Sequence, residues 1–347
     1  MISLVVPTLG RPSLRVLLDA LAAQIGADPV EIILVDDRAD GAALETGFRV
    51  LRGGGNGPAA ARNVGWRAAR GDWVVFVDDD VVPDPGWWAR LRSDLKVPGD
   101  VGGVQARVSV PLPADRRPTD WERNTAGLAD APWITADMAY RRAALAEVGG
   151  FDERFPRAFR EDADLAYRVR AAGWRLRRGE RSITHPVRPA DLWASVRVQA
   201  GNADDALLRR RYGADWRSLL EIPPGRRRRH AVVTGALAVG LAAATADRLR
   251  GGSGPLRAVA AAGGLVWAVG TAEFAARRVA AGPRTPREIA AMALTSVVIP
   301  PVAIGHWIRG WILAATRGEV VDVYFSSPRA SAPGDGNHFD QCRSEAV

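Results

Sequence analysis

The sequence is nearly free of cysteine. Its 347 residues include one, Cys342, which lies within the last six positions. A single thiol forms no disulfide framework, and a zinc site built on cysteines needs several of them. The composition therefore excludes a disulfide-stabilised fold, a cysteine zinc site and a catalytic thiol, and it agrees with a reducing compartment.

Lysine is almost as rare as cysteine. Lys96 is the only lysine among 47 basic residues, which exceed the 39 acidic residues and leave a net charge of +8. Guanidinium groups suit phosphate and anionic lipid, but a preference for arginine over lysine also follows from genome composition alone. No zinc, helix-turn-helix or aromatic RNA-binding pattern accompanies the charge, so we expect no nucleic-acid partner.

The N-terminus lacks the charged segment and the long apolar run of a cleaved signal peptide. Its apolar run, ISLVVP, covers only residues 2–7, and this short run predicts a first buried strand. Four leucines at helical spacing follow a possible N-cap at Ser13. They predict the first helix and are Leu14, Leu17, Leu18 and Leu21.

Strand and helix patterns then alternate. Apolar runs at 30–35 and 73–77 predict buried strands, and a helix is expected over about 58–70 after the turn-rich GGGNGP, which we interpret as a loop. The alternation indicates an α/β fold with a mostly parallel sheet covered by helices on both faces. Acidic residues at 36–37 and 78–80 follow two of the strands, where ligands bind in such sheets.

The composition changes sharply after residue 225. Arg226 to Arg229 form a run of four positive charges, and three stretches without charge follow at 230–246, 258–272 and 289–308. Positive charge concentrates on the cytoplasmic flank of a first membrane span, so we expect a membrane-associated helical region over 226–325 on the cytoplasmic face. The alternative is a soluble domain of alanine-packed helices, because the first two stretches are short and the third contains Pro300 and Pro301. The last residues, 326–347, are expected to be disordered.

Three adjacent carboxylates, Asp78, Asp79 and Asp80, follow the strand WVVFV. Placing them together is costly unless exposure or a cation relieves their repulsion. Side chains alternate along a strand, so Asp78 and Asp80 can share one side and offer two oxygen ligands to a hard divalent ion that also binds a diphosphate. A solvated acidic loop is the alternative.

A second acidic pair begins a predicted helix over 161–172. The helix dipole favours Glu161 and Asp162 in its first turn, and Asp164 with Arg168 forms an i, i+4 pair. This local role does not require Glu161 and Asp162 to face a cleft. An amphipathic stretch is expected around 190–211.

Other candidates have weaker signals. Asp36 and Asp37 could bond a nucleotide base or ribose, although acidic turns after strands are common. Arg62 could meet a phosphate or pair with a neighbouring acid. His185 could be a metal ligand or a structural histidine.

Taken together, the order of these motifs resembles a family 2 glycosyltransferase with the GT-A fold. The resemblance spans about residues 1–215. The matching pieces are VVPTLGRP at 5–12, VDD at 35–37, ARNVGWRAARGDWVVFVDDD at 61–80, YRRAALAEVGGFDERF at 140–155 and EDADLAYRVRAAGW at 161–174.

The resemblance implies inverting transfer from a nucleotide-diphosphate sugar with Mg²⁺ or Mn²⁺ at the diphosphate. It implies a GT-A-type, Rossmann-like domain over 1–225, with a nucleotide-sugar half over about 1–110 and an acceptor half over about 111–225. By position, the residues that would bind the nucleotide sugar are Pro7, Thr8, Arg11, Asp37, Arg62, Asp78 and Asp79. The implied metal ligands are Asp80, Asp78 and His185, and the implied general base is Asp162, with Glu161 beside it.

Two departures refine these expectations. Thr135-Ala136-Asp137-Met138 stands where many relatives have a small residue and Asn before the paired arginines, which leaves the donor-sugar or acceptor contacts there undefined. The QxxRW signature of processive synthases is absent from 175–220, so we expect transfer of a single sugar. The apolar C-terminal third would hold the domain at the membrane, so we expect a lipid-linked or cell-envelope glycan acceptor. One alternative is a non-catalytic scaffold that binds a nucleotide sugar. The other is a sugar nucleotidyltransferase, but such enzymes usually have a Gly-rich loop after the first strand, and VPTLGRP is a poor match to that loop.

Overall fold

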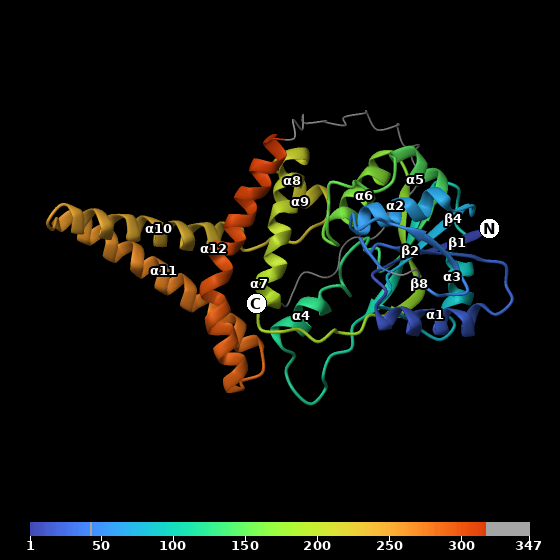
Figure 1. The fold of residues 1–347 in the computed structure, drawn as a ribbon, viewed down its shortest axis with the longest axis horizontal. Helices are drawn as coiled ribbons and strands as arrows, with labels where there is room; N and C mark the ends of the chain where they lie inside the picture. Colours follow the sequence, from blue (N-terminus) through green and yellow to red (C-terminus); the bar gives the residue numbers. More distant parts are fainter. Residues whose placement is uncertain (42–43, 317–347) are drawn as a thin grey trace, which may run out of the picture.

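A computed structural model describes residues 1–41 and 44–316 of the chain. An α/β domain carries a set of long C-terminal helices, two of which form a hairpin that projects from it (Figure 1). The expected tail over 326–347 lies outside the described residues.

One eight-stranded sheet organises the α/β domain, in the order β3-β2-β1-β4-β7-β6-β8-β5. Its strands are β1 Ile2–Thr8, β2 Glu31–Asp36, β3 Arg49–Arg52, β4 Trp73–Val77, β5 Val82–Pro83, β6 Val101–Ser109, β7 Asp137–Arg141 and β8 Arg175–Thr184. β4 and β6 both pair antiparallel with β7, and β5 pairs antiparallel with β8. Six of the eight strands nevertheless run in one direction, and only β5 and β7 oppose them. The α/β class and the expected mostly parallel sheet are confirmed.

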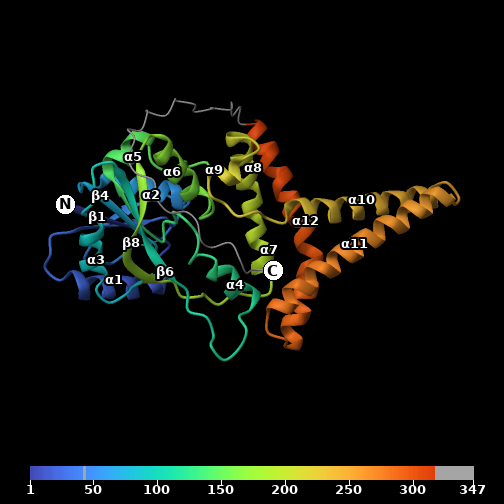
Figure 2. The same cartoon turned by 180° about the vertical axis from the view of Figure 1, so that it is seen from behind.

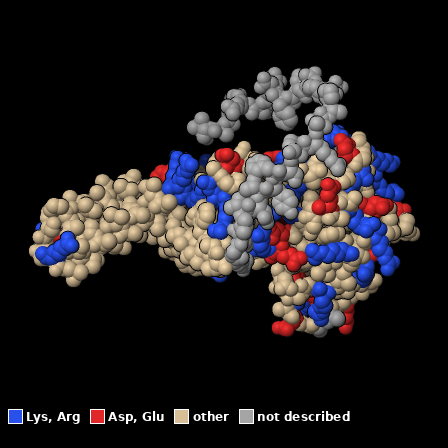
Figure 3. Space-filling view, turned by 90° about the horizontal axis from the view of Figure 1, so that it is seen from above, with Lys and Arg blue, Asp and Glu red and all other residues tan. Residues whose placement is uncertain are grey.

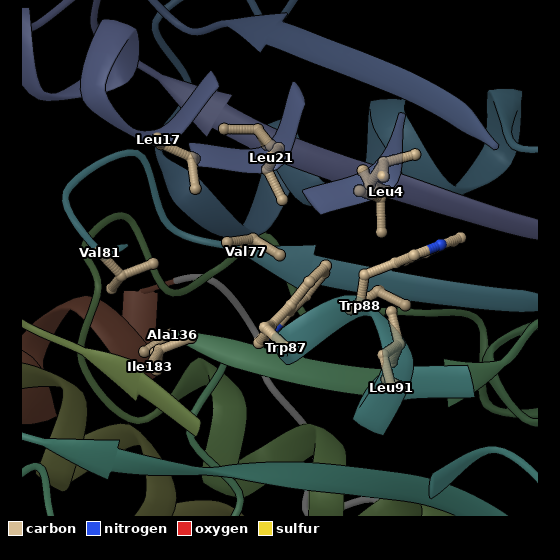
Figure 4. Packing of buried hydrophobic residues seen from close by; sticks show 14 of the residues in the cluster. Leu4, Leu17, Leu21, Val77, Val81, Trp87, Trp88, Leu91, Ala136 and Ile183 are labelled. Carbon is tan, nitrogen blue, oxygen red and sulfur yellow. The ribbon is translucent and has the colours of Figure 1, made fainter. Parts of the chain in front are cut away.

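Helices cover both faces of the sheet. Successive residues of β1 point to opposite sides, so each face presents apolar side chains that a helix can cover. Leu4 packs with leucines of α1 (Pro12–Ile25) and Trp87 of α3 (Trp87–Asp94), a cluster shown in Figure 4. Val5 packs on the other face, with side chains of α2 (Pro58–Ala68), α5 (Arg142–Val148) and α6 (Glu161–Ala171).

α2 lies directly against β1. A Cβ atom on Gly65 would come 2.2 Å from Cγ1 of Val5 and 3.1 Å from Cγ2 of Val35. Only glycine therefore allows this approach, which places the first turns of α2 beside the carboxyl ends of the central strands.

One local expectation was wrong. α1 begins at Pro12 with Arg11 as its N-cap, and Ser13 lies inside the helix with its Oγ buried and unbonded. Proline suits the first helical turn, so it sets the helix start in place of a serine cap. The GGGNG segment is a turn as expected. It follows β3, a strand too short and polar to show an apolar run.

A fully buried ion pair fastens the antiparallel part of the sheet. The guanidinium of Arg181, in β8, lies 2.9 Å from Oδ1 of Asp137 in β7, and both side chains are 0% exposed. Arg181 also donates to the Val104 carbonyl, and the Trp87 indole donates to Oδ2 of Asp137. Asp137 lies in the segment 135–138, which departs from the family pattern. Both oxygens of its carboxylate bond to buried side chains, so this residue has a structural role.

The C-terminal region consists of three helices, α10 Arg227–Leu249, α11 Gly254–Ala281 and α12 Pro286–Thr316, each long and apolar enough to cross a membrane. α10 and α11 form the hairpin, which extends away from the domain, and α12 runs across its base beside α8 (Figure 2). The short helices that connect this region to the sheet are α4 Asp120–Ala126, α7 Ala194–Arg197, the 3₁₀ turn Val198–Gly201, α8 Asn202–Tyr212 and α9 Trp216–Leu219. The expected apolar helical region is confirmed, and Pro300 and Pro301 lie inside α12 without ending it.

Polar contacts join the hairpin to the α/β domain. Arg278 of α11 is 8% exposed and donates from Nη2 to Oδ2 of Asp120 in α4 at 2.8 Å. Its Nη1 donates to the hydroxyls of Thr295 and Ser296 in α12. One guanidinium therefore connects α4, α11 and α12.

Replacing Arg181 by leucine is expected to lower the free energy of unfolding by ~3–5 kcal/mol, because the buried carboxylate of Asp137 loses its counter-charge. Denaturant unfolding of the detergent-solubilised chain, followed by tryptophan fluorescence, measures the change. Arg107→Leu is the matched control, since its ion pair with Glu180 is exposed and should contribute under ~1 kcal/mol. Equal losses in the two variants would show that the buried pair has no special weight.

Candidate active site

A buried arginine joins three elements at the carboxyl end of β4. Arg62 of α2 is 2% exposed; its Nη1 lies 2.8 Å from Oε1 of Glu161, and its Nη2 lies 2.8 Å from Oδ1 of Asp78. Asp78 follows β4 and Glu161 begins α6, so the two carboxylates come from segments far apart in sequence. Arg62 places one positive charge between the two carboxylates and fixes α6 relative to the end of the strand. Burial and the neighbouring Asp162 nevertheless raise the pKa of Glu161 to about 8.

Asp162 stands beside this cluster without an ion pair among the residues that the structure describes. Its side chain is half-buried, and Oδ1 accepts a 2.7 Å hydrogen bond from the backbone N–H of Ala163. Burial raises the pKa of Asp162, and the neighbouring Asp78 adds to the rise while Arg62 and Arg160 oppose it. An accessible carboxylate that holds a proton more readily than usual is suited to proton transfer.

The backbone before α6 is held in an unusual conformation. Arg160 has φ +78°, in the left-handed region that side chains other than glycine rarely adopt. Its Nε donates to Oδ1 of Asp205 in α8 at 2.8 Å, and its guanidinium lies over the Phe159 ring. These contacts keep the strained residue in place, and the chain turns there so that Glu161 and Asp162 begin the helix.

α8 anchors the segment that precedes α6. Arg157 pairs with Asp204 at 2.7 Å, and Arg211 pairs with Asp152 at 2.6 Å. Together with the bond between Arg160 and Asp205, these pairs attach residues 152–160 to one helix. The position of Asp162 therefore depends on α8 as well as on the sheet.

Asp79 turns away from Asp78 and toward the end of β1, as alternation along the strand predicts. It accepts hydrogen bonds from the Thr8 hydroxyl at 2.6 Å and from Nη1 of Arg11 at 3.0 Å. The structure thus brings three of the predicted residues together, with Asp79 buried beneath the β1–α1 turn. Pro7, in the same strand, is partly exposed.

Asp37 lies at the end of β2 and is 8% exposed. Its carboxylate accepts from the backbone N–H groups of Asn56 and Gly57 at 3.1 and 2.9 Å, which orders the turn that leads into α2. Burial raises the pKa of Asp37. The preceding Asp36 is fully buried and pairs with Arg38 and Arg52, so its role is structural.

Asp80 and His185 face one another beyond the ends of β4 and β8. Nε2 of His185 lies 3.7 Å from Oδ1 of Asp80, beyond hydrogen-bond distance, while Nδ1 lies 3.2 Å from the Pro186 carbonyl. Arg188 supplies the counter-charge, with Nη2 3.0 Å from Oδ2 of Asp80. A carboxylate and an imidazole whose outer nitrogen points at it are donors that fit one divalent cation.

The structure does not unite all the predicted metal ligands. Asp78 pairs with Arg62, whereas Asp80 pairs with Arg188, and no group of three or more His, Cys, Asp or Glu side chains placed to hold a metal occurs within residues 1–41 and 44–316. The expected two-aspartate grip is not formed in this arrangement. Arg188 carries no signal in the sequence, because it lies in a proline-containing segment without periodicity.

Comparison with known proteins finds similarity to glycosyltransferases. Residues 3–163 match Glycosyl transferase family 2. The pre-mycofactocin glycosyltransferase of Mycobacterium tuberculosis is 34% identical over 134 residues, which are 35% of this chain and 28% of that protein. An uncharacterized glycosyltransferase of Haemophilus influenzae is 37% identical over 87 residues, 23% of this chain and 29% of its own. The chain spans less than a third of the length of these relatives.

Among solved structures, the mannosyltransferase PcManGT from Pyrobaculum calidifontis in complex with GDP-Man and Mn²⁺ aligns with a TM-score of 0.49 and 19% identity, over 89% of this chain and 86% of that one. The glucosyl-3-phosphoglycerate synthase of Mycobacterium tuberculosis, in complex with Mn²⁺, UDP-glucose and phosphoglyceric acid, aligns with a TM-score of 0.41 and 18% identity, over 65% of this chain and 81% of that one.

Asp162→Asn is expected to raise the thermal stability of the chain at pH 8, because ionising a carboxylate whose pKa is raised in the folded state destabilises that state. The gain should shrink as the pH falls and disappear below the pKa of an unfolded aspartate. Thermal unfolding of the variant and the wild-type protein from pH 8 to pH 4 measures this trend.

The matched control is Asp164→Asn, two residues further along α6. Asp164 is fully buried and ion-paired with Arg168 and Arg211, so its loss should lower the melting temperature. A destabilised Asp162→Asn protein at pH 8 would contradict the raised pKa.

Proposed function

We propose, from the premise that residues 3–163 are a family 2 glycosyltransferase domain, that this chain transfers a single sugar from a nucleotide-diphosphate sugar to a lipid-linked or cell-envelope glycan acceptor, with inversion at the anomeric carbon. The observation that carries the proposal is the unpaired Asp162 beside the buried Arg62 cluster. The family match includes the whole of this cluster.

Asp162 is the proposed general base. Its carboxylate takes the proton of an acceptor hydroxyl while that oxygen bonds to the anomeric carbon, and the bond from this carbon to the diphosphate oxygen breaks on the opposite side. The raised pKa of Asp162 favours proton uptake. Glu161 is a positioning residue, because its buried carboxylate is engaged by Arg62.

The proposed donor site lies along the ends of β1, β2 and β4. The partly exposed Pro7 and the remaining acceptor capacity of Asp37 suit a nucleoside. The side chain of Arg11 is 38% exposed and is placed to meet phosphate or sugar oxygens. Asp79 holds this arginine by an ion pair and holds the β1–α1 turn through the Thr8 hydroxyl. Asp78 and Arg62 line the same edge and complete the set proposed for the donor.

Asp80 and His185 are the proposed ligands of a divalent cation, Mg²⁺ or Mn²⁺. Such a cation neutralises the charge of the departing diphosphate. Both side chains are largely buried and face each other without a hydrogen bond, which leaves their donor atoms for a shared ligand. Without a cation, Arg188 supplies the counter-charge of Asp80. Its side chain is 52% exposed and is free to move aside when a cation binds.

The C-terminal helices suggest association with a membrane. We propose that the hairpin of α10 and α11 inserts from the cytoplasmic face, with the arginines at 226–229 at the water boundary. The uncharged part of α10, residues 230–246, is ~26 Å long at ~1.5 Å per residue, close to the ~30 Å hydrocarbon core. This anchor would keep the catalytic domain beside a lipid-linked acceptor.

Asp162→Asn should reduce sugar transfer by ~10²-fold or more, the usual contribution of a general base, while donor binding is retained. Release of nucleoside diphosphate from a panel of nucleotide sugars, with a membrane lipid extract as acceptor, measures the transfer. Glu153→Gln is the control, because Glu153 is half exposed and lies outside the cluster.

Turnover by the Asp162→Asn protein at the wild-type rate would overturn the base assignment. A wild-type chain that binds a nucleotide sugar but releases no diphosphate with any acceptor would favour the scaffold.

Asp80→Ala should weaken Mn²⁺-dependent binding of the donor by at least ~10-fold, because it removes the carboxylate proposed to hold the cation. Equilibrium binding of a nucleotide sugar with Mn²⁺ and with EDTA measures the effect without any turnover. Asp100→Asn, a surface carboxylate paired with Arg175, serves as the control. Unchanged Mn²⁺ dependence in Asp80→Ala would exclude Asp80 as a ligand.

A further inference from the structure

A groove opens at the base of the hairpin, away from the cluster around Arg62. It has a volume of about 790 Å³ and lies between α10 and α11, with Pro300 of α12 at its margin. None of the residues proposed for catalysis or donor binding lines it. Its side chains therefore call for a different ligand.

The groove is apolar toward the tip of the hairpin and charged toward its base. On the tip side, the lining includes Val232, Leu265 and Val269, which are 61%, 65% and 60% exposed. On the base side, it includes Arg226, Arg228, Arg229, Glu273 and Arg277. From Leu265 to Arg277 the helix rises ~18 Å at ~1.5 Å per residue, so the two ends of the groove are well separated.

The charged end carries an excess of positive charge. Arg226, Arg229 and Arg277 all pair with one carboxylate, Glu273. Arg228 is exposed and forms no ion pair with any residue in the described part of the chain. Nε of Arg226 is buried without a hydrogen-bond partner. Four guanidinium groups thus share one negative charge, and an anionic ligand would complete the balance.

Close packing of the two helices holds the groove open in one shape. A Cβ atom on Gly270 would come 2.5 Å from Cγ2 of Val233, so glycine allows α10 and α11 to touch at this level. Phe274 lies beneath the guanidinium of Arg226 and stacks edge-on with His230. The wall between the apolar and charged ends is therefore built from packed side chains.

Figure 3 shows the same polarity over the hairpin as a whole. Basic side chains gather near its base on the face in view, and the shaft beyond them is almost uniformly uncharged. An amphiphile lying in the groove would point its polar end toward the catalytic domain and its apolar end toward the tip. A lipid in the leaflet next to the domain has this orientation if the hairpin is inserted in a bilayer.

We propose that this groove binds one anionic phospholipid, with its phosphate at Arg226, Arg228 and Arg229 and an acyl chain along Val232, Leu265 and Val269. The proposal rests on membrane insertion of the hairpin, one part of the proposed function, and is independent of sugar transfer. A protein helix is a poorer fit, because it would cover the apolar end and leave the arginines without an anion.

The test uses the full chain, delipidated in detergent and titrated with phosphatidylglycerol or phosphatidylcholine of the same acyl composition. Native mass spectrometry counts the bound lipids and gives their dissociation constants. We expect one phosphatidylglycerol per chain, bound at least ~10-fold more tightly than phosphatidylcholine. Arg228→Gln combined with Arg229→Gln should weaken phosphatidylglycerol binding by roughly 30-fold, from ~1 kcal/mol per arginine.

Two matched controls separate the groove from general attraction. Arg248→Gln with Arg250→Gln removes the same charge at the tip of the hairpin and should leave binding unchanged. Val269→Trp fills the apolar end and should weaken both lipids by at least ~5-fold, whereas Val239→Trp, at an equally exposed position outside the groove, should not.

Equal affinity for the two lipids, equal loss in the tip variant, or no effect of Val269→Trp would each overturn the proposal. Displacement of the lipid by millimolar inorganic phosphate would also overturn it, since the site would then recognise free phosphate. Carbonate extraction of membranes tests insertion separately, and nucleoside diphosphate release tests catalysis. If both of these tests succeed and the chain shows no lipid preference, the proposed function stands and the lipid site is rejected.

Discussion

The guanidinium of Arg62 is the contact on which the rest of the α/β domain depends. It is almost completely buried, and burial of an unpaired charge costs several kcal/mol, so it requires both Asp78 and Glu161. Those two partners lie at the end of β4 and the start of α6, and Gly65 sets α2 close enough to β1 for the arginine to reach them. Arg62 engages two of the local carboxylates, and Asp162 is left without an ion pair among the described residues.

A series of contacts leads from this cluster to the C-terminal helices. Residues 152–160 are fastened to α8 by Arg157, Arg160 and Arg211, and α8 packs against α12. On another route, Arg278 joins α11 and α12 to α4. The apolar helices are therefore integrated with the domain, and their placement fixes the loops that surround the site.

The parts of the structure that the sequence predicted are those with local signals. Apolar runs identified β1, β2 and β4, and the acidic pair at the start of α6 was placed correctly. β6, β7 and β8 escaped detection because their pairing is set by distant partners, such as Arg181 with Asp137. The same limit applies to the site, whose candidate residues came from motifs. The motifs did not show that Asp78 pairs with Arg62 and Asp80 with Arg188, because the fold brings these side chains together. Local patterns cannot specify such pairings.

The link between Arg278 and Asp120 has a geometric consequence. Because a buried guanidinium clamps α4 to both α11 and α12, the α/β domain is held at one tilt relative to the hairpin. With the hairpin embedded in a bilayer, the proposed base Asp162 would stand at a set distance from the membrane surface. An acceptor hydroxyl would then be selected by its distance above the membrane as well as by its chemistry.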